Sequence, residues 1–217
     1  NTEFSGEQSN INEGFTDEIK GKYTLKRSFS EYFFPKGDFI IQGESEILYN
    51  IIEDDNGFSK IEGLGDLENL NLKSDFLGPN LDFNNGKLRF LIRPYDNSFS
   101  GFADIKTNNL NVEVNSIFNL TKLIELDVQT FKSPKQNFNL KYEGENNKFL
   151  INADKLSLDS IDIFEEDNLK IENFELDLKI NDFKIGDMKF SNSIIYAKKL
   201  NNFFKKIDVS LIGENDF

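Results

Sequence analysis

The side chains that could carry chemistry in this chain are carboxylates, because two of the commonest catalytic residue types are missing. The 217 residues include no histidine and no cysteine. Without histidine, the side chain that ordinarily exchanges protons near neutral pH is absent. Ser-His and Cys-His nucleophile pairs are therefore excluded, and so are disulfides and cysteine-based zinc sites. These absences remove many hydrolase mechanisms.

The densest carboxylate clusters are Glu165-Glu166-Asp167 and Glu53-Asp54-Asp55. A glycosidase needs two carboxylates that flank the scissile bond in a substrate cleft. Both clusters stand beside turn signals, and the chain has no tryptophan on which a sugar ring could stack. We interpret both clusters as solvated loops.

Other short motifs are weaker still. Residues 53–57 resemble part of a calcium loop but lack its ligand spacing and its distal glutamate. Gly63-Leu64-Gly65 is followed by neither Lys-Ser nor a third glycine, so it is not a nucleotide loop. Asn119-Leu120-Thr121 matches a glycosylation sequon, a triplet short enough to occur by chance. We therefore expect no catalytic residue, no metal site and no cofactor, and we predict that the chain is not an enzyme.

The charge balance restricts the partners. With 38 acidic and 25 basic residues, the formal net charge is −13. Nucleic acid, which is bound by basic surfaces, would be repelled, and so would an anionic membrane surface. The sequence shows no signal peptide and no run of about 18 apolar residues that could span a membrane. We expect an internal piece of a longer polypeptide, whose anchor or export signal would lie outside it.

The elements that must position any site are strands, because apolar residues recur at every second position. The run 174–180 is the clearest, with four apolar residues on one face and three charges on the other. Such alternation is typical of antiparallel strands with one dry and one wet face. The positions that we predict to share the apolar face are Leu88, Phe90, Ile92, Leu110, Val112, Val114, Ile124, Leu126, Val128, Phe138, Leu140, Tyr142, Phe149, Ile151, Phe174, Leu176, Leu178, Ile180, Ile207, Val209 and Leu211.

Turn residues separate these runs. Asp55-Asn56-Gly57 and Asn84-Asn85-Gly86 predict tight hairpins, and residues 144–147 predict a further hairpin loop. Only residues 116–123 could form a short helix, because Ile117, Leu120 and Leu123 recur at spacings of three. The sequence therefore predicts an all-β fold, a long antiparallel meander of short strands with at most one short helix. We expect residues 1–20 to be a frayed or orphaned strand, and residues 21–217 to form one continuous unit without a linker.

The apolar face has two possible roles. It could be the closed core of a β-sandwich or barrel, or it could line a long curved sheet that stays open. An exposed apolar surface of that size would need a ligand, and acyl chains suit it because they require apolar area without directed hydrogen bonds. Alternation alone does not choose between these two readings.

Three stretches, residues 67–78, 149–156 and 174–190, resemble the AsmA-like superfamily, especially its YhdP- and TamB-type members. The resemblance spans roughly residues 60–212 and lies in the succession of alternating strands and small polar turns. It implies a taco-shaped β-groove, anchored in the inner membrane of a diderm bacterium by a helix outside this segment. The groove would cross the periplasm and conduct phospholipid between the inner and outer membranes. Its partners would be acyl chains and the two membranes, and the predicted apolar positions would be its groove residues.

Two other functions remain open at this point. One is a structural or adhesive cell-surface protein, a β-sandwich or β-solenoid with a closed core. The other is a carbohydrate-active enzyme, which the absence of histidine and tryptophan disfavours.

Overall fold

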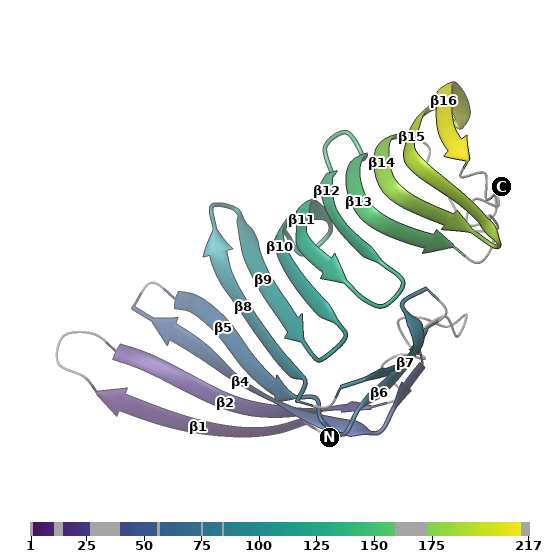
Figure 1. Ribbon diagram of the computed structural model, residues 1–217. Helices are drawn as coiled ribbons and strands as arrows, with labels where there is room; N and C mark the ends of the chain where they lie inside the picture. The colour runs from purple at the N-terminus through teal and green to yellow at the C-terminus, as the bar shows by residue number, and fades with distance from the viewer. Residues whose placement is uncertain are drawn as a thin grey trace.

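A computed structural model describes residues 2–10, 15–26, 40–55, 57–74, 76–83, 85–158 and 173–213. These residues form strands and turns and no helix, arranged as a large curved sheet and a small one (Figure 1). The all-β fold and the predicted curved meander are confirmed. In the described part of the chain, no helix is long and apolar enough to cross a membrane.

The large sheet, called the main sheet here, has thirteen strands, and nearly all follow one another in chain order. In spatial order they are β1 (Thr2–Asn10), β2 (Phe15–Lys26), β4 (Glu44–Asp54), β5 (Gly57–Asp66), β8 (Lys87–Tyr95), β9 (Ser98–Lys106), β10 (Asn111–Phe118), β11 (Leu123–Lys132), β12 (Asn137–Glu143), β13 (Lys148–Leu158), β14 (Phe174–Ile185), β15 (Met188–Leu200) and β16 (Phe203–Gly213). The order is linear, with β1 and β16 at its two ends, so the sheet is not closed into a barrel.

The first residues of the chain belong to this sheet. β1 pairs with β2 in one antiparallel register, from Thr2 opposite Tyr23 to Asn10 opposite Phe15. The segment 1–20, for which we expected a frayed or orphaned strand, thus contributes β1 and the first part of β2 in its described residues.

One strand pair departs from the antiparallel meander. β13 and β14 run parallel, with Phe149 opposite Leu176 and Ile151 opposite Leu178. A parallel pair cannot be joined by a tight hairpin, because the chain must return along the strand before it enters the next one. The connecting residues 159–172, which include the Glu165-Glu166-Asp167 cluster, lie outside the described residues.

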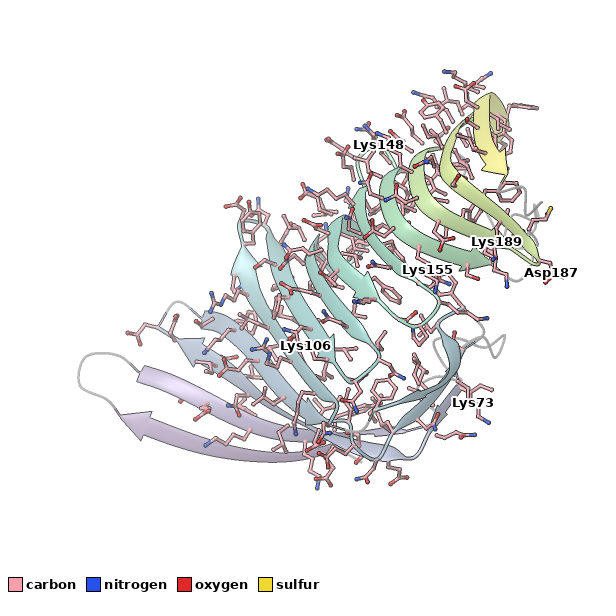
Figure 2. The ribbon with its side chains drawn as sticks, viewed as in Figure 1. Lys73, Lys106, Lys148, Lys155, Asp187 and Lys189 are labelled. Carbon is pink, nitrogen blue, oxygen red and sulfur yellow. The ribbon has the colours of Figure 1, made fainter. Side chains whose placement is uncertain are left out.

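The small sheet, called the cap sheet here, consists of β3 (Ile40–Gln42), β6 (Asn71–Ser74) and β7 (Gly78–Asp82). It packs on one face of the main sheet, which we call the inner face, along the line where β5 ends and β10 begins. Leu72 and Ile41 turn toward the main sheet, whereas Lys73 points away from it (Figure 2).

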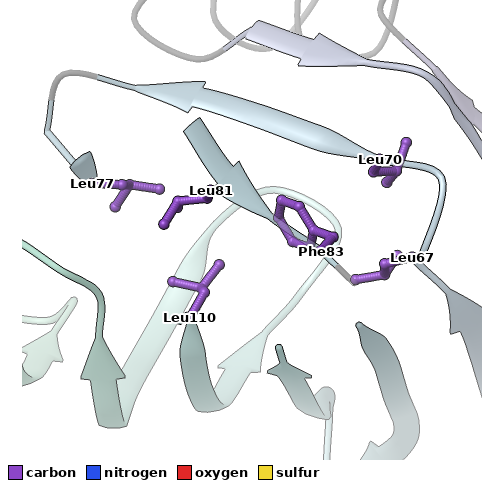
Figure 3. Packing of buried hydrophobic residues seen from close by; sticks show 6 residues of the cluster. All are labelled: Leu67, Leu70, Leu77, Leu81, Phe83 and Leu110. Atoms are coloured by element: carbon purple, nitrogen blue, oxygen red, sulfur yellow. The ribbon is translucent and has the colours of Figure 1, made fainter. Parts of the chain in front are cut away.

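The two sheets meet in a crease that contains the buried core. The buried cluster contains Leu110, from the turn between β9 and β10. The other members come from the cap sheet and its connections and are Leu67, Leu70, Leu77, Leu81 and Phe83 (Figure 3). A second buried cluster continues along the main sheet through Ala153, Leu158, Leu178, Ile180 and Phe183. Phe76 packs against both clusters and so joins them.

Two of the predicted hairpin turns are confirmed. Gly57, at φ +97°, opens β5 directly after β4, and Asn147, at φ +47°, closes the loop between β12 and β13. The third prediction is wrong. Asn85 has the expected positive φ of 56°, but this turn leads from β7 of the cap sheet to β8 of the main sheet, which do not pair.

The helix considered for residues 116–123 is absent. β10 extends to Phe118 and β11 begins at Leu123. Between them the side-chain oxygen Oδ1 of Asn119 accepts hydrogen bonds from the backbone N–H groups of Thr121 and Lys122, at 2.9 and 3.0 Å. An Asx turn of this kind offers the backbone an alternative to a helical turn, so the spacing of three apolar residues was misleading.

Candidate functional site

The inner face carries a continuous apolar row across twelve neighbouring strands. Side chains directly opposite one another on paired strands point to the same face, so the register of each pair defines the row. We call it the central row, and its members are Gly21, Tyr49, Gly63, Phe90, Ala103, Val114, Val128, Leu140, Ile151, Leu178, Ile195 and Val209. From β2 to β16 it contains no charged side chain.

Two further rows flank the central row. The crease row lies next to the cap sheet and contains Tyr23, Ile47, Gly65, Leu88, Ile105, Val112, Phe131, Phe138, Ala153, Ile180 and Ser193. The rim row lies on the other side and contains Ile19, Ile51, Ile61, Ile92, Gly101, Ser116, Leu126, Tyr142, Phe149, Leu176, Ala197 and Ile207. Together the three rows form an apolar strip, called the trough here, that runs across the strands.

Burial differs widely among the trough residues. Ile180, in the crease row, is 1% exposed. Leu140 and Ile151, in the central row, are half-buried. At the far end of the sheet, Ile207 and Val209 are each 55% exposed. The cap sheet therefore closes the trough only along the crease, and much of its apolar surface stays accessible.

Glycines allow aromatic rings to lie on the floor of the trough. A Cβ atom at Gly63 would stand 2.2 Å from the ring of Phe90 on the neighbouring strand. A Cβ at Gly21 would collide in the same way with the ring of Tyr49. Both rings are half-buried and occupy space that a side chain would otherwise take. The aromatic rings thus lie flat over the glycines and do not project into the trough.

Further ring contacts continue along the inner face. Phe131 stacks on Phe138 with centroids 4.6 Å apart, and Tyr142 packs on Phe149 at 4.8 Å. Nearer the rim, Phe99 contacts both Phe58 and Phe118, at 6.0 and 5.9 Å. Three of these contacts join neighbouring strands, whereas Phe58 on β5 reaches Phe99 on β9 across β8. The rings thus extend the apolar strip from strand to strand.

The outer face carries ion pairs between neighbouring strands. The Arg89 guanidinium donates two hydrogen bonds to the Asp104 carboxylate, Nε to Oδ1 at 2.7 Å and Nη2 to Oδ2 at 2.8 Å. These bonds, and secondarily the positive charge of Arg89, outweigh the desolvation of the carboxyl and lower the pKa of Asp104. Lys198 with Glu175, at 2.9 Å, is a second cross-strand pair. The charged side thus faces away from the trough.

The outer face is not uniformly polar. Leu48 and Leu64 stand opposite each other on β4 and β5 and are 58% and 63% exposed. The sequence predicts that both leucines lie on the outer face, because each is adjacent in the chain to an inner-face residue and successive side chains of a strand point to opposite faces.

The structure brings most of the predicted apolar positions onto one face. The predicted members of the three rows, from Leu88 to Val209, share the trough. Leu110 is instead buried in the crease core, at 4% exposure. Ile124 has no opposite residue on β10, because the register is irregular where β10 ends and β11 begins. Leu211 follows Val209 on the same face of β16, beyond a register shift of β15.

Several trough residues escaped the sequence prediction. Tyr23, Ile47, Tyr49 and Ile61 extend all three rows into the first part of the chain. The alternating triplet Ile47-Tyr49-Ile51 was the signal that could have identified them. Small residues such as Ala103 were missed because a short side chain contributes little to an apolar pattern.

The described residues contain no cluster of three or more acidic side chains that could hold a metal ion. Asp54 and Asp55 lie exposed at the turn between β4 and β5. No protein-family model, curated protein or solved structure matches this chain.

Proposed function

We propose that the trough binds the acyl chains of phospholipids and lets them move along the sheet, without catalysing a reaction. The observation that carries the proposal is the central row, an uncharged strip across twelve strands. Some of its side chains, such as Leu140 and Ile151, are only half-buried, and Val209 is 55% exposed. Strands are spaced by about 4.8 Å, so the eleven intervals of this row extend over roughly 50 Å along the sheet. An apolar surface of that extent is rare on proteins that have no partner for it.

Acyl chains match this surface chemically. They gain about 0.8 kcal/mol for each methylene removed from water and need no directed hydrogen bond. Because the rows offer similar apolar area on each successive strand, a chain can shift by one strand without losing a specific partner. The charged outer face keeps the sheet soluble and discourages stacking with other sheets.

The resemblance to the AsmA-like superfamily supplies the setting of the proposal. In that setting the chain is a section of a longer protein in the periplasm of a diderm bacterium, anchored in the inner membrane by another section. Phospholipid would then pass between the inner and outer membranes along the trough. A structural or adhesive surface protein is the alternative, and it would require the inner face to be covered along its whole length.

Leu176 and Asp177 provide a matched test. They are adjacent on β14, both are half-buried, and they point to opposite faces, with Leu176 in the rim row. Each is replaced by a photoreactive phenylalanine derivative in the full protein in a diderm host, and the crosslinked molecules are identified by mass spectrometry. We expect phospholipid adducts at position 176 and none at position 177.

A second variant separates lipid capture from folding. Leu176→Asp places a charge in the trough, so we expect it to reduce lipid recovery in a protein that still unfolds cooperatively. Asp177→Asn is the control on the outer face. Crosslinks at position 176 that reach only protein would contradict the proposal and favour a covered, structural face.

A further inference from the structure

The described residues leave a cavity of about 470 Å³ between the cap sheet and the first half of the main sheet. Its wall includes Leu25 and Ile47 from one side of the main sheet and Phe90 and Ile105 from the other. Leu72 of the cap sheet and Phe83, which follows β7, close it from above. The cavity therefore lies at the crease, where the cap sheet covers the trough.

The cavity is too large to be a packing defect. Protein interiors contain few voids larger than a water molecule. A dry apolar cavity of about 150 Å³ takes up benzene, with its six carbon atoms. By proportion, a cavity of about three times that volume has room for on the order of eighteen carbon atoms. That is the size of one complete acyl chain.

The wall also selects for hydrocarbon. Among the described residues, no charged side chain contributes to it. Its polar groups are the amide of Asn71 and the hydroxyls of Tyr23 and Tyr49, and the Oδ1 atom of Asn71 is buried without a hydrogen-bond partner. A carboxylate or phosphate buried there would find no cation, and burying an unpaired charge is very costly. A headgroup must therefore remain outside.

The tyrosines indicate where the headgroup would remain. Tyr23 is 38% exposed, so the cavity is open beside its ring. Tyrosine suits such a boundary because its ring is apolar and its hydroxyl prefers water. From the volume, the uncharged wall and this opening, we infer that the cavity holds one acyl chain of a phospholipid, inserted tail first beneath the cap sheet. This inference rests on the proposed function and adds a fixed site to the mobile path along the trough.

The absence of tryptophan from these 217 residues makes the test direct, because one introduced tryptophan is then the only one in this chain. Tyr49→Trp places a fluorescent reporter where the central row forms part of the cavity wall, and Tyr142→Trp places a matched one in the rim row on β12, outside the cavity. Both tyrosines are half-buried on the inner face. Each folded variant is titrated with vesicles of a phospholipid that carries bromine in mid-chain, which quenches tryptophan on contact. Free brominated fatty acid is titrated in parallel, to show whether the cavity prefers the acyl chain of a phospholipid or a free fatty acid.

A filling variant tests the cavity itself. Leu72→Phe adds volume inside it, whereas Leu140→Phe adds the same volume in the open trough. Excluding two methylenes weakens binding by about tenfold. We therefore expect Leu72→Phe to weaken the quenching of the Tyr49→Trp reporter at least about tenfold, and Leu140→Phe to leave it unchanged. Ile41→Phe replaces Leu72→Phe if that variant does not fold.

The two reporters separate the possible failures. Saturable quenching at position 49 that Leu72→Phe weakens at least about tenfold and Leu140→Phe leaves unchanged supports the cavity site, and saturable quenching there that Leu72→Phe leaves unchanged overturns it. Quenching at position 142 without quenching at position 49 overturns the cavity site and leaves the trough intact. Quenching at position 49 alone supports the cavity and contradicts the proposed transport path. No quenching at either position contradicts both.

Discussion

The side chain of Gln136 ties the cap sheet to the main sheet through the backbone of Phe76. Its Nε2 donates to the carbonyl oxygen of Phe76 at 2.6 Å and to that of Ser157 at 2.8 Å. Its Oε1 accepts from the N–H of Ser157 at 3.0 Å. Gln136 is completely buried, so all three bonds form away from water. One amide thus links the turn between β6 and β7 of the cap sheet to β13 of the main sheet.

Replacement of Gln136 should therefore loosen the cap. Gln136→Leu keeps the volume but leaves the carbonyl of Phe76 and both backbone groups of Ser157 without their partner. An unsatisfied buried polar group costs about 1–3 kcal/mol, and we expect a loss of that order in the free energy of unfolding. Hydrogen exchange should accelerate in β6 and β7 before it does in β13. Asn152→Leu is the control, because Asn152 is an exposed amide bonded to Asn139. Equal losses in both variants would mean that Gln136 is not a special link.

The glycine beneath Phe90 should be required for a flat floor. In Gly63→Ala the new Cβ would overlap the Phe90 ring, which must turn into the trough. Overpacking of this kind costs roughly 1–3 kcal/mol, measured by denaturant unfolding. Gly213→Ala is the control, because a Cβ there has nothing within 4 Å.

A double-mutant cycle identifies the cause of that loss. If the ring is the obstacle, Phe90→Leu added to Gly63→Ala should restore part of the stability, with a coupling energy of at least about 0.5 kcal/mol. Strictly additive effects would show that the alanine acts through the backbone instead.

The Arg89–Asp104 pair should make stability depend on pH in the acid range. The pKa of Asp104 is lowered in the folded protein by the hydrogen bonds from Arg89. A carboxylate of this kind stabilises the fold above its unfolded pKa, about 3.9, and the contribution is lost as the pH falls through the lower folded value. Asp104→Asn should therefore be less stable than the parent near neutral pH. The difference should shrink as the pH drops below about 4.

Asp208→Asn is the matched control for that titration. Asp208 pairs with Lys206 at 2.7 Å, but both side chains are about 60% exposed. Exposed pairs contribute little, so this variant should follow the parent at every pH. A difference between Asp104→Asn and the parent that stays constant from neutral to acid pH would contradict the assignment.

The local alternation of apolar and polar residues was sufficient to predict most strands and to assign their apolar and polar faces. The alternation of Phe174, Leu176, Leu178 and Ile180 predicts both the strand and its buried side, because successive side chains of a strand point in opposite directions. Most of the positions that this rule selects lie in the trough. The rule does not predict the register irregularity at Ile124, since such irregularities depend on how two strands pair.

The partners of each strand were decided only by the tertiary structure. Apolar and polar residues alternate in the same way in a closed sandwich and in an open sheet. The backbone groups of a strand can pair with those of any other strand, so the alternation does not select a partner. The local sequence pattern does not show that the strands carrying Leu72 and Leu81 fold over the inner face, or that β14 runs parallel to β13. Those choices depend on contacts between distant residues, such as Gln136 with Phe76. They create both the crease and the cavity beneath the cap sheet, while the strand pattern alone determined that an apolar face would exist.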